Sequence, residues 1–197
     1  MTPTALILML RPIALSTVSY TATVTIIPTT MPQAYYLHGI DLTNVTPPGK
    51  LMNSTPPPQS QQEILCELLR DETCYFYSPP LSQLAIQNGT WHLYIWASTA
   101  SSGKTSKLTI QIHIVSSDGN TEKSLVGSIS DIVIDYGHSE RDIQIMGNFA
   151  NISQNDRIRL TIHVQTGSEN GPKGIKFYYD GYGTYQTLNH ETRLQPP

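Results

Sequence analysis

The sequence has little charge, almost no cysteine and no uninterrupted long apolar run. Only 14% of its 197 residues are Asp, Glu, Lys or Arg, against roughly 25% in an average soluble protein. Ser, Thr, Asn, Gln and Tyr must therefore cover much of the surface, and exposed Tyr often makes contacts. The net charge of −3 excludes nucleic acid as a partner, because binding to phosphates needs a concentrated basic face.

The two cysteines, Cys66 and Cys74, are too few for a disulfide framework or a thiolate zinc site. They lie close together in the chain, in a segment flanked by proline. One disulfide between them would close a small loop. The alternative is two free, partly buried thiols.

Motifs of catalysis are also absent. Ser102-Gly103-Lys104-Thr105 resembles part of a phosphate-binding loop, but Ser98 stands where that loop needs a glycine. The sequence has no G-x-S-x-G nucleophile elbow and no H-E-x-x-H zinc motif. We therefore predict no enzyme, no catalytic residues and no cofactor. Four aspartates near predicted strand ends leave structural calcium as an alternative: Asp118, Asp131, Asp135 and Asp180.

Apolar residues do cluster near the N-terminus. Residues 5–10 look like the core of a signal peptide, although Arg11-Pro12 interrupts the run and leaves it too short to span a bilayer. A strand is the alternative, because five residues alternate with Ser and Thr: Val18, Tyr20, Ala22, Val24 and Ile26. Residues 1–33 are thus interpreted as a signal remnant or a donor strand, followed by a proline-bounded linker.

Residues 34–197 alternate with a period of two and predict one all-β domain. In residues 107–115 and 157–164, Ile, Leu and Val point one way, while polar residues such as His113 and His163 point to solvent. Further strands are predicted at 34–38, 74–77, 83–87, 91–97, 124–134, 142–149 and 174–180. About eight or nine strands with one buried face predict an antiparallel, jelly-roll-like β-sandwich with an extra N-terminal strand-like segment.

Two segments break this pattern. Residues 43–62 are rich in proline and predict an extended surface loop. Residues 61–70 predict one short helix.

Sequons and tyrosines are the candidate functional features. Four N-x-S/T sequons fall in predicted loops or at strand edges, where a glycan can attach: Asn44, Asn53, Asn88 and Asn151. The segment 177–185 concentrates four tyrosines that form a candidate contact face: Tyr178, Tyr179, Tyr182 and Tyr185. The alternative is that half of them pack against the neighbouring sheet.

The order of short motifs resembles a known kind of module. Tyr35-Tyr36-Leu37-His38-Gly39 is followed by Trp91–Ala97, and Phe177–Gly181 comes before Arg193-Leu194. Ser117-Asp118-Gly119 and Asn155–Leu160 lie between them. Over residues 34–197 the chain is similar to jelly-roll modules of archaeal and bacterial secreted cell-surface proteins. The resemblance implies an extracellular structural or adhesive unit and transfers no catalytic residue.

From these features we predict a secreted structural subunit of a glycosylated surface assembly or filament. Residues 18–27 would complete the sheet of a neighbouring copy, so a homo-oligomer or polymer is expected. A carbohydrate-binding or adhesion module that contacts a surface polysaccharide through the Tyr-rich face is the first alternative. A viral capsid or spike jelly roll is the second.

Overall fold

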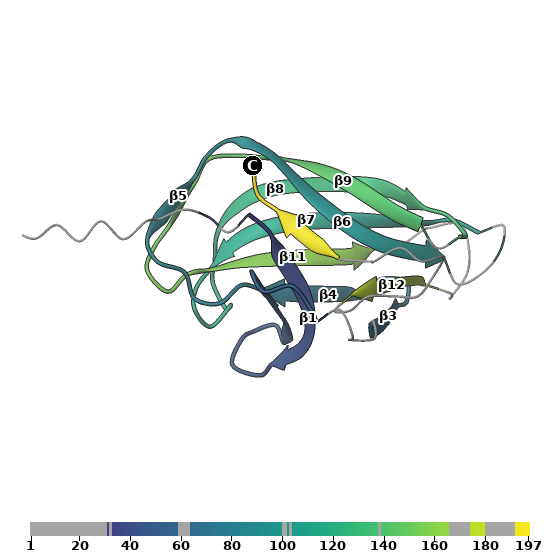
Figure 1. Ribbon diagram of the computed structural model, residues 1–197, viewed down its shortest axis with the longest axis horizontal. Coiled ribbons are helices and arrows are strands. Elements are labelled where there is room, and N and C mark those ends of the chain that lie inside the picture. The colour runs from purple at the N-terminus through teal and green to yellow at the C-terminus, as the bar shows by residue number, and fades with distance from the viewer. Residues whose placement is uncertain are drawn as a thin grey trace, which may run out of the picture.

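The computed structural model describes residues 31, 33–58, 64–99, 102, 104–137, 139–165, 174–179 and 192–197, and all of its regular elements are strands (Figure 1). The strands are β1 (Tyr35–Leu42), β2 (Gly49–Asn53), β3 (Ile64–Leu68), β4 (Thr73–Tyr77), β5 (Leu84–Ile86), β6 (Gly89–Thr99), β7 (Ser106–Val115), β8 (Glu122–Ile134), β9 (Ser139–Gly147), β10 (Ala150–Ile152), β11 (Arg157–Val164), β12 (Ile175–Tyr179) and β13 (Arg193–Gln195).

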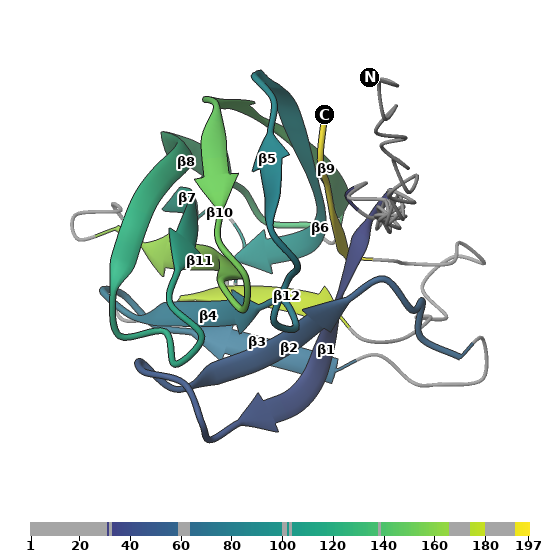
Figure 2. The same cartoon turned by 90° about the vertical axis from the view of Figure 1, so that its left-hand side faces the viewer.

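The strands close into a nine-stranded barrel. Hydrogen-bonded neighbours run β13-β1-β2-β4-β11-β7-β8-β9-β6, and β13 pairs again with β6 to complete the ring. Beyond the ring, β12 pairs with β6 and carries β3 on its other edge. Figure 2 shows β5 and β10 side by side as a separate two-stranded ribbon. The paired strands are antiparallel except for β2 and β4, which run parallel.

The core is built from the alternating apolar residues of these strands. In β7 and β11 the Ile, Leu and Val positions predicted to point inward are all buried. Three aromatic rings join the two sides of the interior. Phe76 of β4 lies 5.4 Å from the ring of Tyr179 and 6.3 Å from that of Phe177, both edge to face.

A second, smaller core lies outside the barrel wall. Val45, in the loop between β1 and β2, packs with Tyr77 of β4 and Val115 of β7. The Tyr77 hydroxyl donates to the Pro47 carbonyl over 2.8 Å, and the Thr46 amide donates to the Asp118 carbonyl over 2.7 Å. The β1–β2 loop thereby covers one end of the outer face of β4, β11 and β7.

Gly119 makes this close packing feasible. It has a φ of 77°, and a Cβ there would lie 2.7 Å from the Thr46 carbonyl oxygen.

The all-β prediction is confirmed, and each predicted strand in residues 34–180 overlaps an observed one. The predicted sandwich of two separate sheets is replaced by a closed barrel, because β13 is hydrogen-bonded to both β1 and β6. Alternation of apolar and polar residues in a sequence indicates which face of a strand is buried. It does not indicate whether the first and last strands of a sheet pair with each other.

Two local predictions are wrong. Residues 61–70 were predicted as a helix, but Ile64–Leu68 is strand β3. Its Leu68 and Cys66 face the core from an edge strand, and a run this short fits either period. The proline-rich segment also contains β2, whose residues pair with β1. The candidate donor strand, residues 18–27, lies outside the described residues.

The part of the chain that the structure describes contains no helix that could cross a membrane.

Candidate functional site

The outer surface of β6, β9 and β13 carries a group of aromatic and charged side chains. In β6, Trp91, Leu93 and Ile95 point into the core, so the residues between them point outward. Cross-strand pairing places Tyr94 opposite both Asp142 of β9 and Arg193 of β13. We call this surface the aromatic face and define it by Tyr36, His92, Tyr94, Glu140, Asp142, Met146, Tyr178 and Arg193, with Trp96 beneath it at 7% exposed.

Tyr94 is the centre of the aromatic face. The Arg193 guanidinium carbon lies 4.2 Å from the centroid of the Tyr94 ring, which is a cation–π contact. The His92 ring stacks beside Tyr94, with 6.0 Å between centroids and 15° between planes. His92 Nδ1 lies 2.9 Å from an Asp142 carboxylate oxygen. The contacts hold four side chains in fixed positions before any partner binds.

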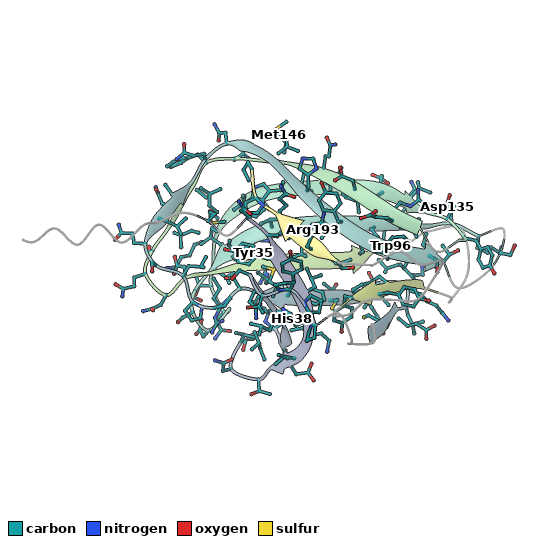
Figure 3. The ribbon with its side chains drawn as sticks, viewed as in Figure 1. Tyr35, His38, Trp96, Asp135, Met146 and Arg193 are labelled. Carbon is teal, nitrogen blue, oxygen red and sulfur yellow. The ribbon has the colours of Figure 1, made fainter. Side chains whose placement is uncertain are left out.

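Both ends of the aromatic face extend onto neighbouring strands. Trp96 pairs across the strands with Tyr178 of β12, and Tyr36 of β1 pairs with Arg193. Met146 of β9 lies at the other end and is 71% exposed. Figure 3 shows Trp96, Arg193 and Met146 along β6, β13 and β9. Aromatic residues, Met and Arg are the types enriched in protein–protein interfaces.

The opposite wall of the barrel carries a polar cluster that is largely buried. Arg159 of β11 is only 5% exposed, pairs with His113 of β7 in register, and forms an ion pair with Glu122. Its guanidinium also lies over the Tyr75 ring, 5.5 Å from the centroid. Hydrogen bonding from Arg159 lowers the pKa of Glu122, and burial lowers the pKa of His113. We call Arg159, Glu122 and His113 the arginine cluster.

Thr73, His163 and Asp71 lie together at the start of β4. Thr73 Oγ1 and His163 Nδ1 are 3.0 Å apart, whereas His163 Nε2 is 3.8 Å from the Asp71 carboxylate. A hydroxyl beside an imidazole is the pair that can begin acyl transfer. However, 3.8 Å is beyond hydrogen-bond distance, so Asp71 does not orient the ring as the acid of a catalytic triad does.

Thr73 also lines a cavity of about 470 Å³ between the β1–β2 hairpin and β4. The polar groups on its wall are few. Lys50 Nζ donates to Asp41 over 2.7 Å, and both residues line the cavity, so both charges are already paired. The other lining residues are Leu42, Thr43, Pro48, Gly49, Cys74 and Tyr75.

Tyr178 and Tyr179, two of the four predicted contact tyrosines, lie on opposite faces of β12. Tyr178 is half-buried on the aromatic face, but Tyr179 is buried and packs against Phe76. Their neighbours in the chain, Tyr182 and Tyr185, lie outside the described residues. Alternation along β12 sends adjacent tyrosines to opposite sides, so four tyrosines close in sequence cannot share one face of a strand.

Three of the four sequon asparagines are exposed, at Asn44, Asn88 and Asn151, and Asn53 is half-buried. Two of these asparagine side chains accept hydrogen bonds from backbone amides. The Asn53 amide oxygen accepts from the Thr55 amide and lies 3.1 Å from His38 Nε2. The Asn88 amide oxygen accepts from the Phe149 amide. N-glycosylation stays a prediction at all four.

Cys66 and Cys74 are free, partly buried thiols. The disulfide between them stays a prediction.

The aspartates suggested for calcium point to different partners. Asp118 accepts from Ser116 and Asn120, Asp131 accepts from Lys107, and Asp135 pairs with Arg141. Asp180 is outside the described residues. Among the residues that the structure describes, no three metal-ligating side chains gather in one place. Structural calcium stays a prediction without a located site.

Sequence reasoning missed the aromatic face and misjudged the arginine cluster. The alternation of Trp91–Ala97 does send His92 and Tyr94 outward, which could have been read from the sequence. Arg193 could not, because it reaches Tyr94 from the end of the chain through the closure of the barrel. His113 was expected to face solvent, but Arg159 and Leu125 flank it on neighbouring strands and leave it 7% exposed. His163, the other histidine in that prediction, is half-buried.

No protein family matches the sequence, and no curated protein matches it either. Solved structures of hydrolases do share the fold. A CocE/NonD family hydrolase from Staphylococcus aureus aligns over 85% of this chain and 37% of its own, with a TM-score of 0.57 and 13% identity. An α-amino acid ester hydrolase aligns over 84% and 36%, with a TM-score of 0.53 and 12% identity.

An aminopeptidase from a marine-sediment archaeon of the Thaumarchaeota aligns over 83% of this chain and 36% of its own, with a TM-score of 0.54 and 11% identity. The chain therefore spans little more than a third of the length of the hydrolases that it resembles.

These likenesses contradict the functional predictions from the sequence. The similar structures named above are hydrolases and not jelly-roll modules of cell-surface proteins. The predictions of a filament subunit, of a carbohydrate-binding module, of a viral jelly roll and of a chain without enzymatic function are wrong on this finding. Short motifs such as Trp91–Ala97 mark strands and turns that many antiparallel proteins need, so they do not identify a family.

Secretion and self-association are not touched by this correction and stay predictions.

Proposed function

We propose that this chain is the β-barrel domain of a hydrolase and that its aromatic face packs against the larger, catalytic part of that enzyme. One observation carries the proposal. The chain aligns with three hydrolases over at least 83% of its own length and at most 37% of theirs. In each of the three enzymes, most of the chain thus lies outside the aligned region. A similar barrel is part of the same chain in all three.

The chemistry of the aromatic face supports this choice of surface. Its centre is prearranged, because Arg193 and His92 hold the Tyr94 ring from two sides. Prearranged aromatic side chains lose little conformational entropy on binding, which favours their use as interface anchors. Charged Asp142 and Glu140 lie at the β9 side, where they can form the polar rim of a contact.

The substrate class is part of the proposal. The names of the similar structures refer to an α-amino acid ester hydrolase and an aminopeptidase. We therefore propose hydrolysis of an ester or amide bond next to an amino acid. The Thr73–His163 pair lacks an oriented carboxylate and does not supply the reacting groups in this account.

The test is an assay of the natural protein that carries this sequence, with aminoacyl p-nitrophenyl esters and aminoacyl p-nitroanilides as substrates. Met146→Glu places a charge on the exposed end of the aromatic face, and Ile40→Glu places one on β1 at a site that is also exposed. We expect hydrolysis by the natural protein, a loss of activity or thermal stability with Met146→Glu, and little effect of Ile40→Glu. Thr73→Val should leave the activity unchanged.

Three results would count against the proposal. Failure to hydrolyse any ester or amide of this class removes the enzyme assignment. Equal effects of Met146→Glu and Ile40→Glu remove the aromatic face as the contact surface. Loss of hydrolysis with Thr73→Val would place the reacting groups in the barrel itself.

A further inference from the structure

Strand β4 has one edge that is only partly covered by another strand. β11 pairs with β4 along Thr73–Tyr77, whereas β2 pairs with the opposite edge only at Phe76 and Tyr77. No other strand in the described part of the chain pairs with β4. The stretch Thr73–Tyr75 therefore has no strand beside it on that edge, and all three of its residues line the cavity between the β1–β2 hairpin and β4.

The backbone of Thr73 faces this cavity. The Val164 amide donates to the Glu72 carbonyl, and the Ser78 amide donates to the Ile158 carbonyl, so the backbone groups of Glu72 and Ser78 point toward β11. Along a strand the N–H and C=O groups of successive residues alternate between the two edges. Those of Thr73 therefore point away from β11, toward the hairpin, and present one donor and one acceptor to the cavity.

The hairpin itself cannot donate to this acceptor. The parallel register pairs Lys50 with Phe76, and its extension toward the start of both segments places Pro47 opposite Thr73. Proline has no N–H group. The Pro47 carbonyl already accepts from the Tyr77 hydroxyl over 2.8 Å. Pairing between the hairpin and β4 thus ends before it reaches Thr73.

The rest of the cavity wall suits an uncharged, apolar group. Leu42, Pro48 and Tyr75 line it, and its volume of about 470 Å³ lies within the range of ligand pockets. Lys50 and Asp41 also line it, but they form an ion pair with each other. The wall therefore combines apolar surface with the two backbone groups of β4 and favours a ligand that carries no charge.

We propose that this cavity binds a short, extended peptide that pairs with Thr73 as an added antiparallel strand. Each peptide residue carries one N–H and one C=O, so a single residue can donate to the Thr73 carbonyl and accept from the Thr73 amide. An apolar side chain on that residue packs against Leu42, Pro48 and Tyr75. The uncovered edge, Thr73–Tyr75, is about 10 Å long, so it takes a short peptide and not a long strand. The proposal is independent of the hydrolase assignment.

The test is a titration of the ¹⁵N-labelled chain with N-acetyl-leucine methylamide, followed by NMR of the backbone amides. We expect saturable shifts of the Thr73 and Tyr75 amides. The control ligand, N-acetyl-N-methyl-leucine methylamide, has the same apolar side chain but lacks the N–H that donates to the Thr73 carbonyl. It should bind about tenfold more weakly, because one hydrogen bond is lost and the Thr73 carbonyl is left buried without a donor.

A pair of variants locates the site. Thr43 is exposed and lines the cavity, whereas Asn44 is exposed and does not line it. Thr43→Trp should fill the cavity and abolish the shifts of the Thr73 amide, and Asn44→Trp should leave them unchanged. The spectrum of each variant without ligand shows whether it is folded, and the comparison of the two ligands on the wild-type chain needs no variant.

Any of four results overturns the proposal. Without a saturable shift at the Thr73 amide, the peptide does not bind there. Equal affinity for the two ligands would mean that the cavity takes apolar molecules without backbone pairing. Equal effects of Thr43→Trp and Asn44→Trp would place the binding elsewhere. Shifts of the Thr73 amide on dilution of the chain without ligand would mean that a segment of a second copy occupies the site.

Discussion

Glu122→Gln is the substitution whose cost can be worked out most fully from the structure. Glu122 forms the ion pair of the arginine cluster, and Arg159 keeps its charge in a position only 5% exposed. Gln keeps the shape and one acceptor oxygen but removes the negative charge. The guanidinium would then keep the Tyr75 ring, 5.5 Å away, as a favourable contact but would lose its negative partner.

The size of the effect follows from burial on the two sides of the pair. Breaking a fully buried ion pair by removing one partner costs about 3–5 kcal/mol. The Glu122 side chain is 55% exposed, so water replaces part of the lost interaction. We therefore expect Glu122→Gln to lower the free energy of unfolding by about 1–2 kcal/mol, which corresponds to a fall in Tm of about 2–8 °C for a chain of this length.

The assay is urea unfolding followed by tryptophan fluorescence at pH 7, with a matched control. Asp131→Asn removes the acid of an ion pair with Lys107 that is exposed on both sides, at 64% and 48% of the side chains, and should cost clearly less than Glu122→Gln. Arg159→Met, alone and combined with Glu122→Gln, completes a double-mutant cycle. Equal costs for Glu122→Gln and Asp131→Asn, or strictly additive costs in the cycle, would refute the reasoning.

Three further predictions concern the core, a close contact and pH. Phe76→Ala should cost about 3–5 kcal/mol in urea unfolding, because it removes a ring that touches Phe177 and Tyr179; a cost under about 1 kcal/mol would mean that the rings are not packed as described. Gly147→Ala should cost about 1–3 kcal/mol, since its Cβ would lie 2.5 Å from the buried Trp91 ring, and an unchanged Tm would contradict that contact. Burial lowers the pKa of His113 below its ordinary value of 6.5, so the unfolded chain binds the proton first and stability should fall as the pH drops below about 6.5. His113→Gln should remove that slope in Tm measured from pH 7.5 to 5.5, and a slope that is unchanged would assign it to other groups.

How far the fold can be read from the sequence depends on the element. In β7 and β11, strict alternation of Ile and Leu with polar residues identifies both the strands and their buried faces. β3 could not be read, because five residues with apolar side chains at both spacings fit a strand or a helix until the pairing with β12 decides. β13 could not be read either, because three residues carry no periodicity and only closure of the barrel brings them to β1 and β6.

The candidate site likewise contains features that can be predicted from one strand and features that need the whole barrel. Outward placement of His92 and Tyr94 follows from alternation within one strand. Their contacts with Asp142 and Arg193 join residues far apart in the chain, so they need the register of three strands. The burial of Arg159 and His113 is a property of the whole wall, where neighbouring strands cover side chains that each strand alone would expose.

The most direct measurement for the central claim is hydroxyl-radical footprinting of the natural protein that contains this chain. Met146 on the aromatic face and Tyr136 in the turn before β9 are both exposed in the barrel, at 71% and 60%. Methionine is the more easily oxidised of the two side chains when both are open to solvent. If the aromatic face packs against the catalytic part of a hydrolase, Met146 should be oxidised more slowly than Tyr136. Faster oxidation of Met146 would show that this face is open and would contradict the account.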